Sequence, residues 1–255
     1  MARTTASLRA LLAKLIDYAG LYPPAGLPLA SAVENYRAYL ASGESWMLNR
    51  LVLPAAKLGE AGMAADWRIT LLMGHEPERL PAQVETFETK MPRRFSLPTY
   101  CEAPLDAIPR GAFAKVRTGG LTPDMIPPTP QLADFLCEAA RRRVPFKATA
   151  GLHHPLRSLR PLTDAADAPH AVLHGFVNVF TAAAFAWHGA RKEIVIDTLN
   201  DVDPSAFDFR DDELRWRGRS LSTAELRAAR RDFAHSFGAC SFEEPIRDLR
   251  ELGLL

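Results

Sequence analysis

Short apolar runs alternate along the chain with longer stretches in which apolar residues recur at helical spacing. The short runs predict strands at residues 49–54, 69–74, 84–89, 97–103, 112–119, 146–152, 173–180 and 238–242. The helical spacing predicts helices at residues 55–65, 129–142, 181–188, 223–236 and 243–252. Eight strands alternating with helices predict an α/β fold, a (β/α)8 TIM-type barrel. We expect it to be irregular around the third and fourth strands, where the connections are too short for full helices.

Two further helices are predicted before the first of these strands. Leu8, Leu11 and Leu12 belong to an apolar series that should end near Gly20, and a second helix is expected over 31–40. Residues 1–45 therefore form an expected N-terminal helical cap on a single barrel domain, 1–255. The loop at 17–24 is mostly apolar with one acid, and is compatible with packing or with a substrate-facing role.

Residues 191–222 are expected to form an excursion before the last strand. Within it, 193–199 is compatible with either helix or strand. Alternating apolar residues around Asp211-Asp212 predict a hairpin. Ser222, followed three residues later by Glu225, predicts a capping box that starts a helix.

Composition narrows the class of partner. The 255 residues carry 31 basic and 30 acidic side chains, a formal net charge of +1, so no strong field attracts nucleic acid or a membrane surface. We therefore expect a small-molecule substrate, no nucleic acid and no membrane partner, and a homo-oligomer stays open. The three cysteines form no C-x-x-C pair, which favours a reducing compartment. No signal peptide or membrane-spanning run is recognisable, so a cytoplasmic location is expected.

A lysine in the middle of an apolar strand is the strongest chemical signal. Alternation along residues 146–152 places Lys147 and Thr149 on the face opposite the apolar Phe146 and Ala148. If the apolar face packs against helices, Lys147 and Thr149 point into the barrel, where a free ammonium is costly unless it is paired or neutral.

The preceding strand carries two cations on one face, Lys115 and Arg117, followed by Gly119 and Gly120. Neighbouring parallel strands would bring these cations close to Lys147. Positive neighbours and burial both favour a neutral amine, which can attack a carbonyl and form a Schiff base. The alternative is that Lys115 and Arg117 form buried ion pairs with Glu85 or Glu102.

Three segments resemble the deoxyribose-phosphate aldolases, a family of class I aldolase barrels. Residues 147–152 (Lys-Ala-Thr-Ala-Gly-Leu) are similar to the family's sixth-strand lysine segment, and residues 114–116 (Ala-Lys-Val) are similar to its fifth strand. Residues 237–241 (Phe-Gly-Ala-Cys-Ser) are similar to its eighth-strand phosphate-binding segment. The resemblance implies Schiff-base chemistry at Lys147 without a cofactor. The family's second lysine and glycine pair, on strand seven, have no counterpart in 173–180, so a phosphorylated sugar is not implied. His174, Asn178 or Lys115 would take the place of that lysine.

Vicinal histidines, His153 and His154, follow the lysine strand at the rim where barrel enzymes keep their active sites. They could act in acid–base catalysis, contact an anion, make structural hydrogen bonds, or bind a metal with Glu102, His174 or Glu243. Ser241 is either a plain helix N-cap or part of an anion site.

The main prediction is an aldolase-like lyase for a small, anionic oxo substrate, with no resident metal or cofactor. The alternatives are a metal-dependent lyase or hydrolase and a barrel that binds a small anion without turnover. The expected catalytic residues are Lys147, Lys115, Glu102, His153 and His154, and the expected substrate-binding residues are Arg117, Thr149, Gly119, Gly120, Asn178, His174, Gly238 and Ser241.

Overall fold

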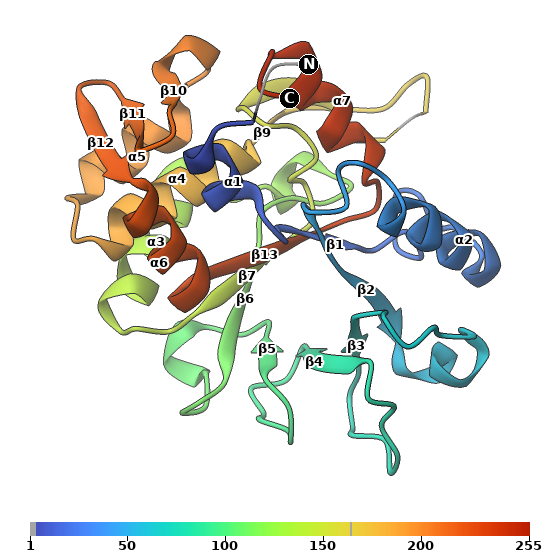
Figure 1. Ribbon diagram of the computed structural model, residues 1–255. Coiled ribbons are helices and arrows are strands. Elements are labelled where there is room, and N and C mark those ends of the chain that lie inside the picture. The colour runs from blue at the N-terminus through green and yellow to red at the C-terminus, as the bar shows by residue number, and fades with distance from the viewer. Residues whose placement is uncertain (1–3, 164) are drawn as a thin grey trace.

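The computed structural model describes residues 4–163 and 165–255, and in these residues eight parallel strands close into a barrel (Figure 1). Around the barrel the strand order is β1-β13-β7-β6-β5-β4-β3-β2. The strands are β1 (Ile16–Tyr18), β2 (Leu48–Pro54), β3 (Ile69–Leu72), β4 (Val84–Thr89), β5 (Thr99–Cys101), β6 (Phe113–Arg117), β7 (Phe146–Thr149) and β13 (Ala234–Ala239). The predicted TIM-type (β/α)8 barrel is therefore confirmed.

Helices cover the barrel unevenly. They are α1 (Ala6–Leu12), α2 (Leu29–Leu40), α3 (Thr129–Arg141), α4 (Phe176–Trp187), α5 (Lys192–Asn200), α6 (Thr223–Asp232) and α7 (Glu243–Glu251), with short 3-10 helices η1 (Ala55–Glu60), η2 (Leu105–Ala107), η3 (Pro123–Met125) and η4 (Pro204–Ala206). Helices α3 to α6 pack together beside β6, β7 and β13, whereas β3, β4 and β5 are joined mainly by loops (Figure 1). The predicted irregularity around the third and fourth expected strands is confirmed.

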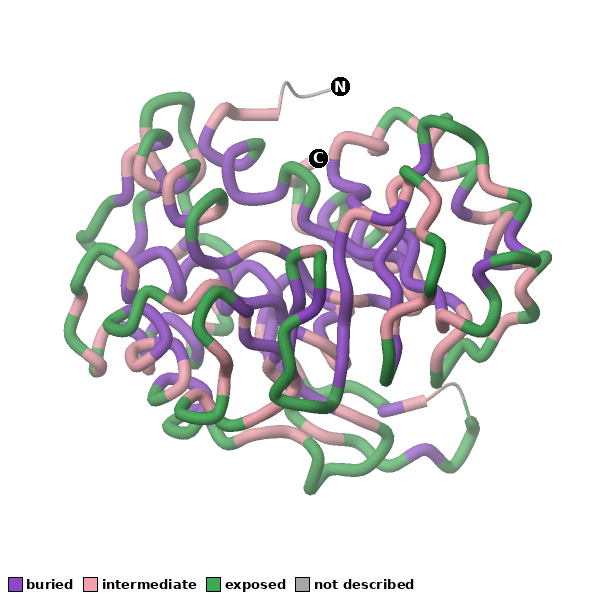
Figure 2. Tube along the Cα trace, turned by 90° about the horizontal axis from the view of Figure 1, so that it is seen from below, coloured by how far each residue is buried: buried purple, intermediate pink, exposed green. Residues whose placement is uncertain are grey.

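The core between β7, β13 and α4 is built from aromatic rings. Phe146 of β7 contacts Phe180 of α4 and Phe233, with ring centroids 6.2 and 5.0 Å apart. Phe237 of β13 also packs on Phe180. Figure 2 shows the barrel strands as largely buried and the exposed residues as lying mainly in the outer loops. This packing holds Lys147 on the opposite, inward face of β7.

Two of the predicted strands are wrong, and one strand was missed. Residues 176–187 form α4 rather than the second half of a strand, because this helix is apolar on nearly all sides and is buried all round. In its place, the three residues of β1 complete the barrel, although they lie in the expected helical cap. The last strand, β13, lies mostly before the predicted 238–242.

These changes alter the position of the lysine strand in the order of the barrel strands. β7 is seventh in chain order among the barrel strands of the described residues, and it pairs directly with β13, Gly238 lying opposite Thr149. No barrel strand of the described residues lies between β7 and β13, so the strand that follows the lysine strand in the aldolase family has no counterpart here. The chain between β7 and β13 instead forms the hairpin β8 (Ser158–Pro161) and β9 (His170–Leu173), α4, α5 and a small sheet.

The excursion before the last strand agrees with the sequence in most details. The segment that was compatible with helix or strand is α5. The predicted hairpin is formed by β10 (Phe207–Phe209) and β11 (Glu213–Trp216), and β12 (Arg219–Ser222) extends it. The capping box at the start of α6 is present in both directions, from Ser222 to Glu225 and back.

The helix predicted over 55–65 is only the 3-10 helix η1. None of the helices in the described residues is long and apolar enough to cross a bilayer.

Candidate active site

A cavity of about 710 Å³ opens at the carboxyl end of the barrel strands. Its walls come from the loops after β1, β4, β5, β6, β7 and β13, from the β8–β9 hairpin and from the first turns of α7. Barrel enzymes place their active sites at this end, and the volume suits a small molecule.

Cationic side chains outnumber acidic ones around the cavity. Within the described residues its lining holds five cations and three carboxylates, which are Lys90, Lys115, Arg117, Arg160 and Arg247, and Glu88, Glu102 and Glu244. This lining therefore attracts an anionic small molecule more strongly than a cationic one.

Lys115 and two carboxylates lie together in the cavity wall. The Nζ atom of Lys115 lies 2.9 Å from Glu88 Oε2 and 3.3 Å from Glu102 Oε2. Glu102 also accepts hydrogen bonds from Arg117 at 3.0 and 3.2 Å through its other oxygen, Oε1. Burial raises the pKa of Glu102, but Lys115 and Arg117 outweigh burial and hold it below its usual range. Oε2 of Glu102 is buried, and among the described residues its polar neighbour is the Lys115 ammonium at 3.3 Å, so a proton can pass between these two groups.

Lys147 lies opposite Lys115 in the barrel register but is more deeply buried. Its Nζ atom lies 2.5 Å from Asp17 Oδ2 and also contacts Glu88, and the side chain is 1% exposed. Burial lowers the pKa of Lys147, but the two carboxylates outweigh burial and raise it above its usual value. The predicted lowering of the Lys147 pKa is wrong because Asp17 and Glu88 both contact its ammonium. Of these groups, Lys115 and Glu88 line the cavity, whereas Lys147 and Asp17 are absent from its described lining.

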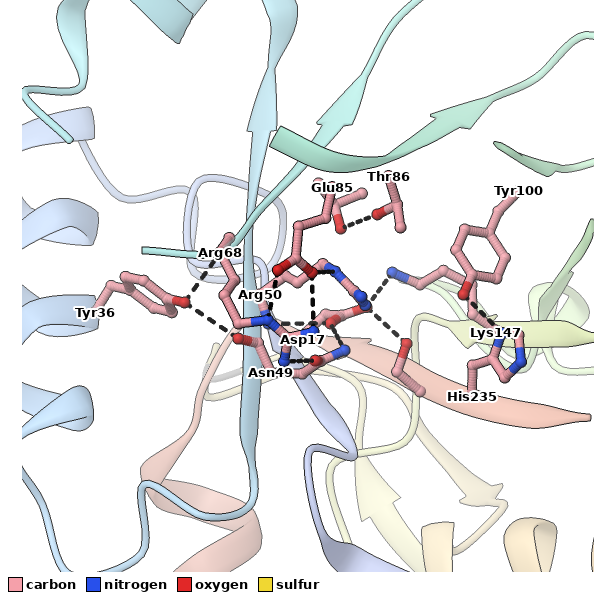
Figure 3. Close-up of polar contacts among 12 residues, drawn as sticks. Asp17, Tyr36, Asn49, Arg50, Arg68, Glu85, Thr86, Tyr100, Lys147 and His235 are labelled. Carbon is pink, nitrogen blue, oxygen red and sulfur yellow. Dashed lines mark hydrogen bonds and ion pairs between the residues drawn. The ribbon is translucent and has the colours of Figure 1, made fainter. Parts of the chain in front are cut away.

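Asp17 connects Lys147 to the opposite end of the barrel (Figure 3). Its carboxylate accepts hydrogen bonds from Asn49 Nδ2 at 2.7 Å, from the Arg50 backbone and from Ser236 Oγ at 2.7 Å, as well as from Lys147. Asp17 is only 1% exposed. Its four donors satisfy the carboxylate in the interior and fix the position of the Lys147 ammonium.

Glu85 belongs to that opposite end and not to the cavity. It pairs with Arg50 and Arg68, each at 2.8 Å. The alternative of buried ion pairs for Lys115 and Arg117 is therefore confirmed for Glu102 and wrong for Glu85. The reason is position along β4: Glu85 lies near the start of the strand, and Glu88 lies near its carboxyl end.

The two vicinal histidines contact α7. Nδ1 of His153 lies 2.8 Å from Glu244 Oε2, and its Nε2 lies 3.8 Å from Cys240 Sγ. Nδ1 of His154 lies 2.5 Å from Asp248 Oδ2. Burial lowers the pKa of His153, but hydrogen bonds to Cys240 and Glu244 raise it to about 10. Both histidines line the cavity, as expected of rim residues.

The predicted substrate-binding residues divide into two groups. Arg117, Gly120, Thr149, Gly238 and Ser241 line the cavity. His174 and Asn178 are fully buried elsewhere and hydrogen-bond to backbone, at Pro127 and at Thr198 and Asp201. Gly119 is also absent from the described lining. Packing excludes a side chain at Gly119, because a Cβ atom at this position would lie 2.8 Å from the Cα of Gly151.

The predicted metal ligands do not converge. In the described part of the chain, no three or more His, Cys, Asp or Glu side chains are grouped so that they could hold a metal ion. His153 and His154 face α7, Glu102 faces Lys115, and His174 faces a backbone carbonyl.

Several residues of the site were not selected from the sequence. Glu88 shares its strand with a second glutamate, Asp17 lies in a short apolar segment that also reads as a loop, and Cys240 lies between Gly238 and Ser241. An acid flanked by apolar residues, as in Ile16-Asp17-Tyr18, was the available signal for a buried carboxylate.

Comparison of the chain with protein-family models, with curated proteins and with solved structures found no match, so its function is argued from the site itself.

Proposed function

We propose that the protein is an aldolase-like lyase that forms a Schiff base between a lysine and a small anionic oxo compound. The observation that carries the proposal is the position of Lys115, which lines the carboxyl-end cavity and whose Nζ atom lies between two carboxylates. The sequence favoured Lys147 for this role. We assign it to Lys115 because Lys147 is 1% exposed and enclosed by Asp17 and Glu88.

Attack by Lys115 requires its ammonium to lose one proton, and Oε2 of Glu102, 3.3 Å away, is placed to receive it. The neutral amine adds to the carbonyl carbon of the substrate, and the protonated Glu102 returns its proton as the carbonyl oxygen leaves as water. When the bond between the α and β carbons of the iminium ion breaks, its electron pair moves towards the iminium to give an enamine, and the β-hydroxyl loses its proton to the Glu102 carboxylate and becomes the carbonyl of the first product. The enamine carbon takes that proton back to form an iminium ion, and water hydrolyses it to release the second product and restore Lys115.

Substrate recognition in this proposal uses the cations of the lining. Arg117 donates to Glu102 through one side of its guanidinium, and its side chain remains 37% exposed towards the cavity. It can therefore hold a substrate carboxylate in a charge-assisted pair. Lys90 and Arg160 line the same cavity and add positive charge for the substrate.

Lys147 acts in this proposal as a positioning residue. It shares Glu88 with Lys115, and the two lysines together lower the pKa of Glu88 to about 2 despite its burial. Glu88 therefore stays ionised and keeps Lys115 in place for attack.

Borohydride trapping tests the proposal. The protein is incubated with a panel of small aldehydes, ketones and 2-oxo acids, reduced with sodium borohydride, and analysed by intact mass and peptide mapping. We expect a substrate-sized adduct on Lys115, lost in Lys115→Met and retained in Lys57→Met, whose lysine is exposed in η1. Absence of any adduct across the panel, or an adduct that persists in folded Lys115→Met, contradicts the proposal. An adduct that maps to Lys147 would overturn the assignment of the nucleophile.

A further inference from the structure

A cysteine, a histidine and a glutamate form a connected series on the α7 side of the cavity. Sγ of Cys240 lies 3.8 Å from Nε2 of His153, and Nδ1 of the same ring lies 2.8 Å from Glu244 Oε2. Because Glu244 accepts at Nδ1, the ring presents Nε2 to the sulfur. This is the order of nucleophile, base and orienting carboxylate that activated cysteines require.

The fold brings these three residues together from separate segments. His153 follows β7 and Cys240 follows β13, and these two strands are neighbours in the barrel. Glu244 lies in the first turn of α7, where its backbone N–H donates to Ser241 Oγ at 3.1 Å. This hydrogen bond joins the cysteine loop to the helix that carries the carboxylate.

All three residues line the cavity, and Cys240 is partly exposed. By contrast, Cys101 is buried beside the Arg93 carbonyl, and Cys137 lies on α3. The side chain of Glu244 is 31% exposed and that of His153 is 15% exposed. A histidine that served packing alone would not need a carboxylate at one ring nitrogen and a thiol at the other.

Other charged groups surround the series. Arg247 of α7 and the neighbouring His154 act on Glu244, Tyr18 of β1 acts on Cys240, and Glu243 of α7 acts on Tyr18. The imidazole of His153 has its pKa raised to about 10, so a protonated ring facing the sulfur is favoured near neutral pH.

We propose that Cys240 is the nucleophile of an acyl-transfer site, with His153 as acid–base and Glu244 as the residue that orients it. The cavity volume of about 710 Å³ suits a small ester or thioester and not a folded protein. Arg247 and Arg160, which line the cavity, favour an anionic acyl compound.

Acyl transfer to Cys240 and hydrolysis of the acyl-enzyme require no oxidant. The Cys240 thiolate adds to the acyl carbon, the bond from that carbon to the leaving oxygen or sulfur breaks, and protonated His153 gives its proton to the leaving group. A thioester on Cys240 results. Water then loses a proton to His153 and adds to the thioester, and the carbon–sulfur bond breaks to release the acid and restore the thiolate.

The first test is the pH profile of alkylation by iodoacetamide, followed by peptide mapping. For a free thiol with a pKa of about 8.5, the thiolate fraction falls roughly 75-fold between about pH 8 and about pH 6. We expect the alkylation rate at Cys240 to fall less steeply than this over the same range, because the His153 ring lies 3.8 Å from its Sγ. In His153→Gln the profile should become that of N-acetylcysteine, and in Glu244→Gln it should move part of the way. A wild-type Cys240 profile that matches N-acetylcysteine overturns the proposal, as does a flat profile in folded His153→Gln.

The second test uses p-nitrophenyl acetate as an acyl donor. We expect a burst of p-nitrophenol close to one equivalent and the mass of one acetyl group on the Cys240 peptide, both absent in Cys240→Ser. Acetylation that is confined to other residues, or a burst that persists in Cys240→Ser, overturns the acyl-transfer role. Neither readout involves a lysine adduct, so failure here and failure of the Schiff-base proposal are distinguishable.

Discussion

Replacing Lys147 with methionine should destabilise the fold strongly, because Lys147 is the shared cation of two buried carboxylates. Asp17 and Glu88 are 1% and 3% exposed. Lowering the pKa of Glu88 from 4.5 to about 2 corresponds to about 3 kcal/mol, at about 1.4 kcal/mol per pKa unit. Lys115 still contacts Glu88 in the variant, but Asp17 loses its only described lysine. Removing one partner from a buried pair typically costs about 3–5 kcal/mol, so we expect a loss of about 3 kcal/mol.

The stability contribution of Glu88 also depends on pH, in a direction that follows from its lowered pKa. The pKa of Glu88 is lower in the folded state than its ordinary 4.5, so its contribution to stability is present above about pH 4.5 and is lost as the pH falls through about 2. In Lys147→Met the pKa of Glu88 rises, so this contribution shrinks. The free energy of unfolding of the variant should therefore approach that of the wild type as the pH falls.

Urea denaturation followed by circular dichroism at pH 7 and at about pH 3 measures both effects. The matched control is Lys57→Met, since the Lys57–Glu60 pair is exposed on both sides and such pairs contribute about 0–1 kcal/mol. The double variant Lys147→Met/Glu88→Gln should lose less than the sum of its single variants, because it removes one of the stranded charges. A loss below about 1 kcal/mol in Lys147→Met at pH 7 would refute the reasoning.

Three further predictions follow from local geometry. Glu102→Gln should slow adduct formation at Lys115 by about 100-fold while leaving binding of the oxo compound intact, as measured by single-turnover trapping; an unchanged rate would remove Glu102 as the proton acceptor. Gly151→Ala should destabilise the fold by more than about 1 kcal/mol in thermal or urea unfolding, because φ is +79° and a Cβ would lie 2.8 Å from Gly119 Cα; wild-type stability would show that the loop adapts. Ser222→Ala should cost about 1 kcal/mol by loss of the capping box of α6, and Ser222→Thr should restore most of it; equal losses in both variants would point to packing instead.

The site shows what a sequence pattern can and cannot specify. Strand alternation correctly turned Lys115 and Lys147 inward, and the rim position of His153 followed from the end of β7. The sign of the pKa shift at Lys147 was wrong because the deciding carboxylate, Asp17, lies 130 positions away in the chain. Alternation reports the face on which a side chain lies, but it contains no information about which charges meet it across the barrel interior.

The sequence by itself determined the barrel class, most helices, the capping box and the inward lysines, because each depends on the periodicity of nearby residues. Tertiary structure decided that three residues, β1, close the barrel and that residues 176–187 form α4. A three-residue strand is too short to show a period, and a helix buried on every side shows no polar face. Tertiary structure also brought Cys240, His153 and Glu244 together, since only closure of the barrel makes β7 and β13 neighbours.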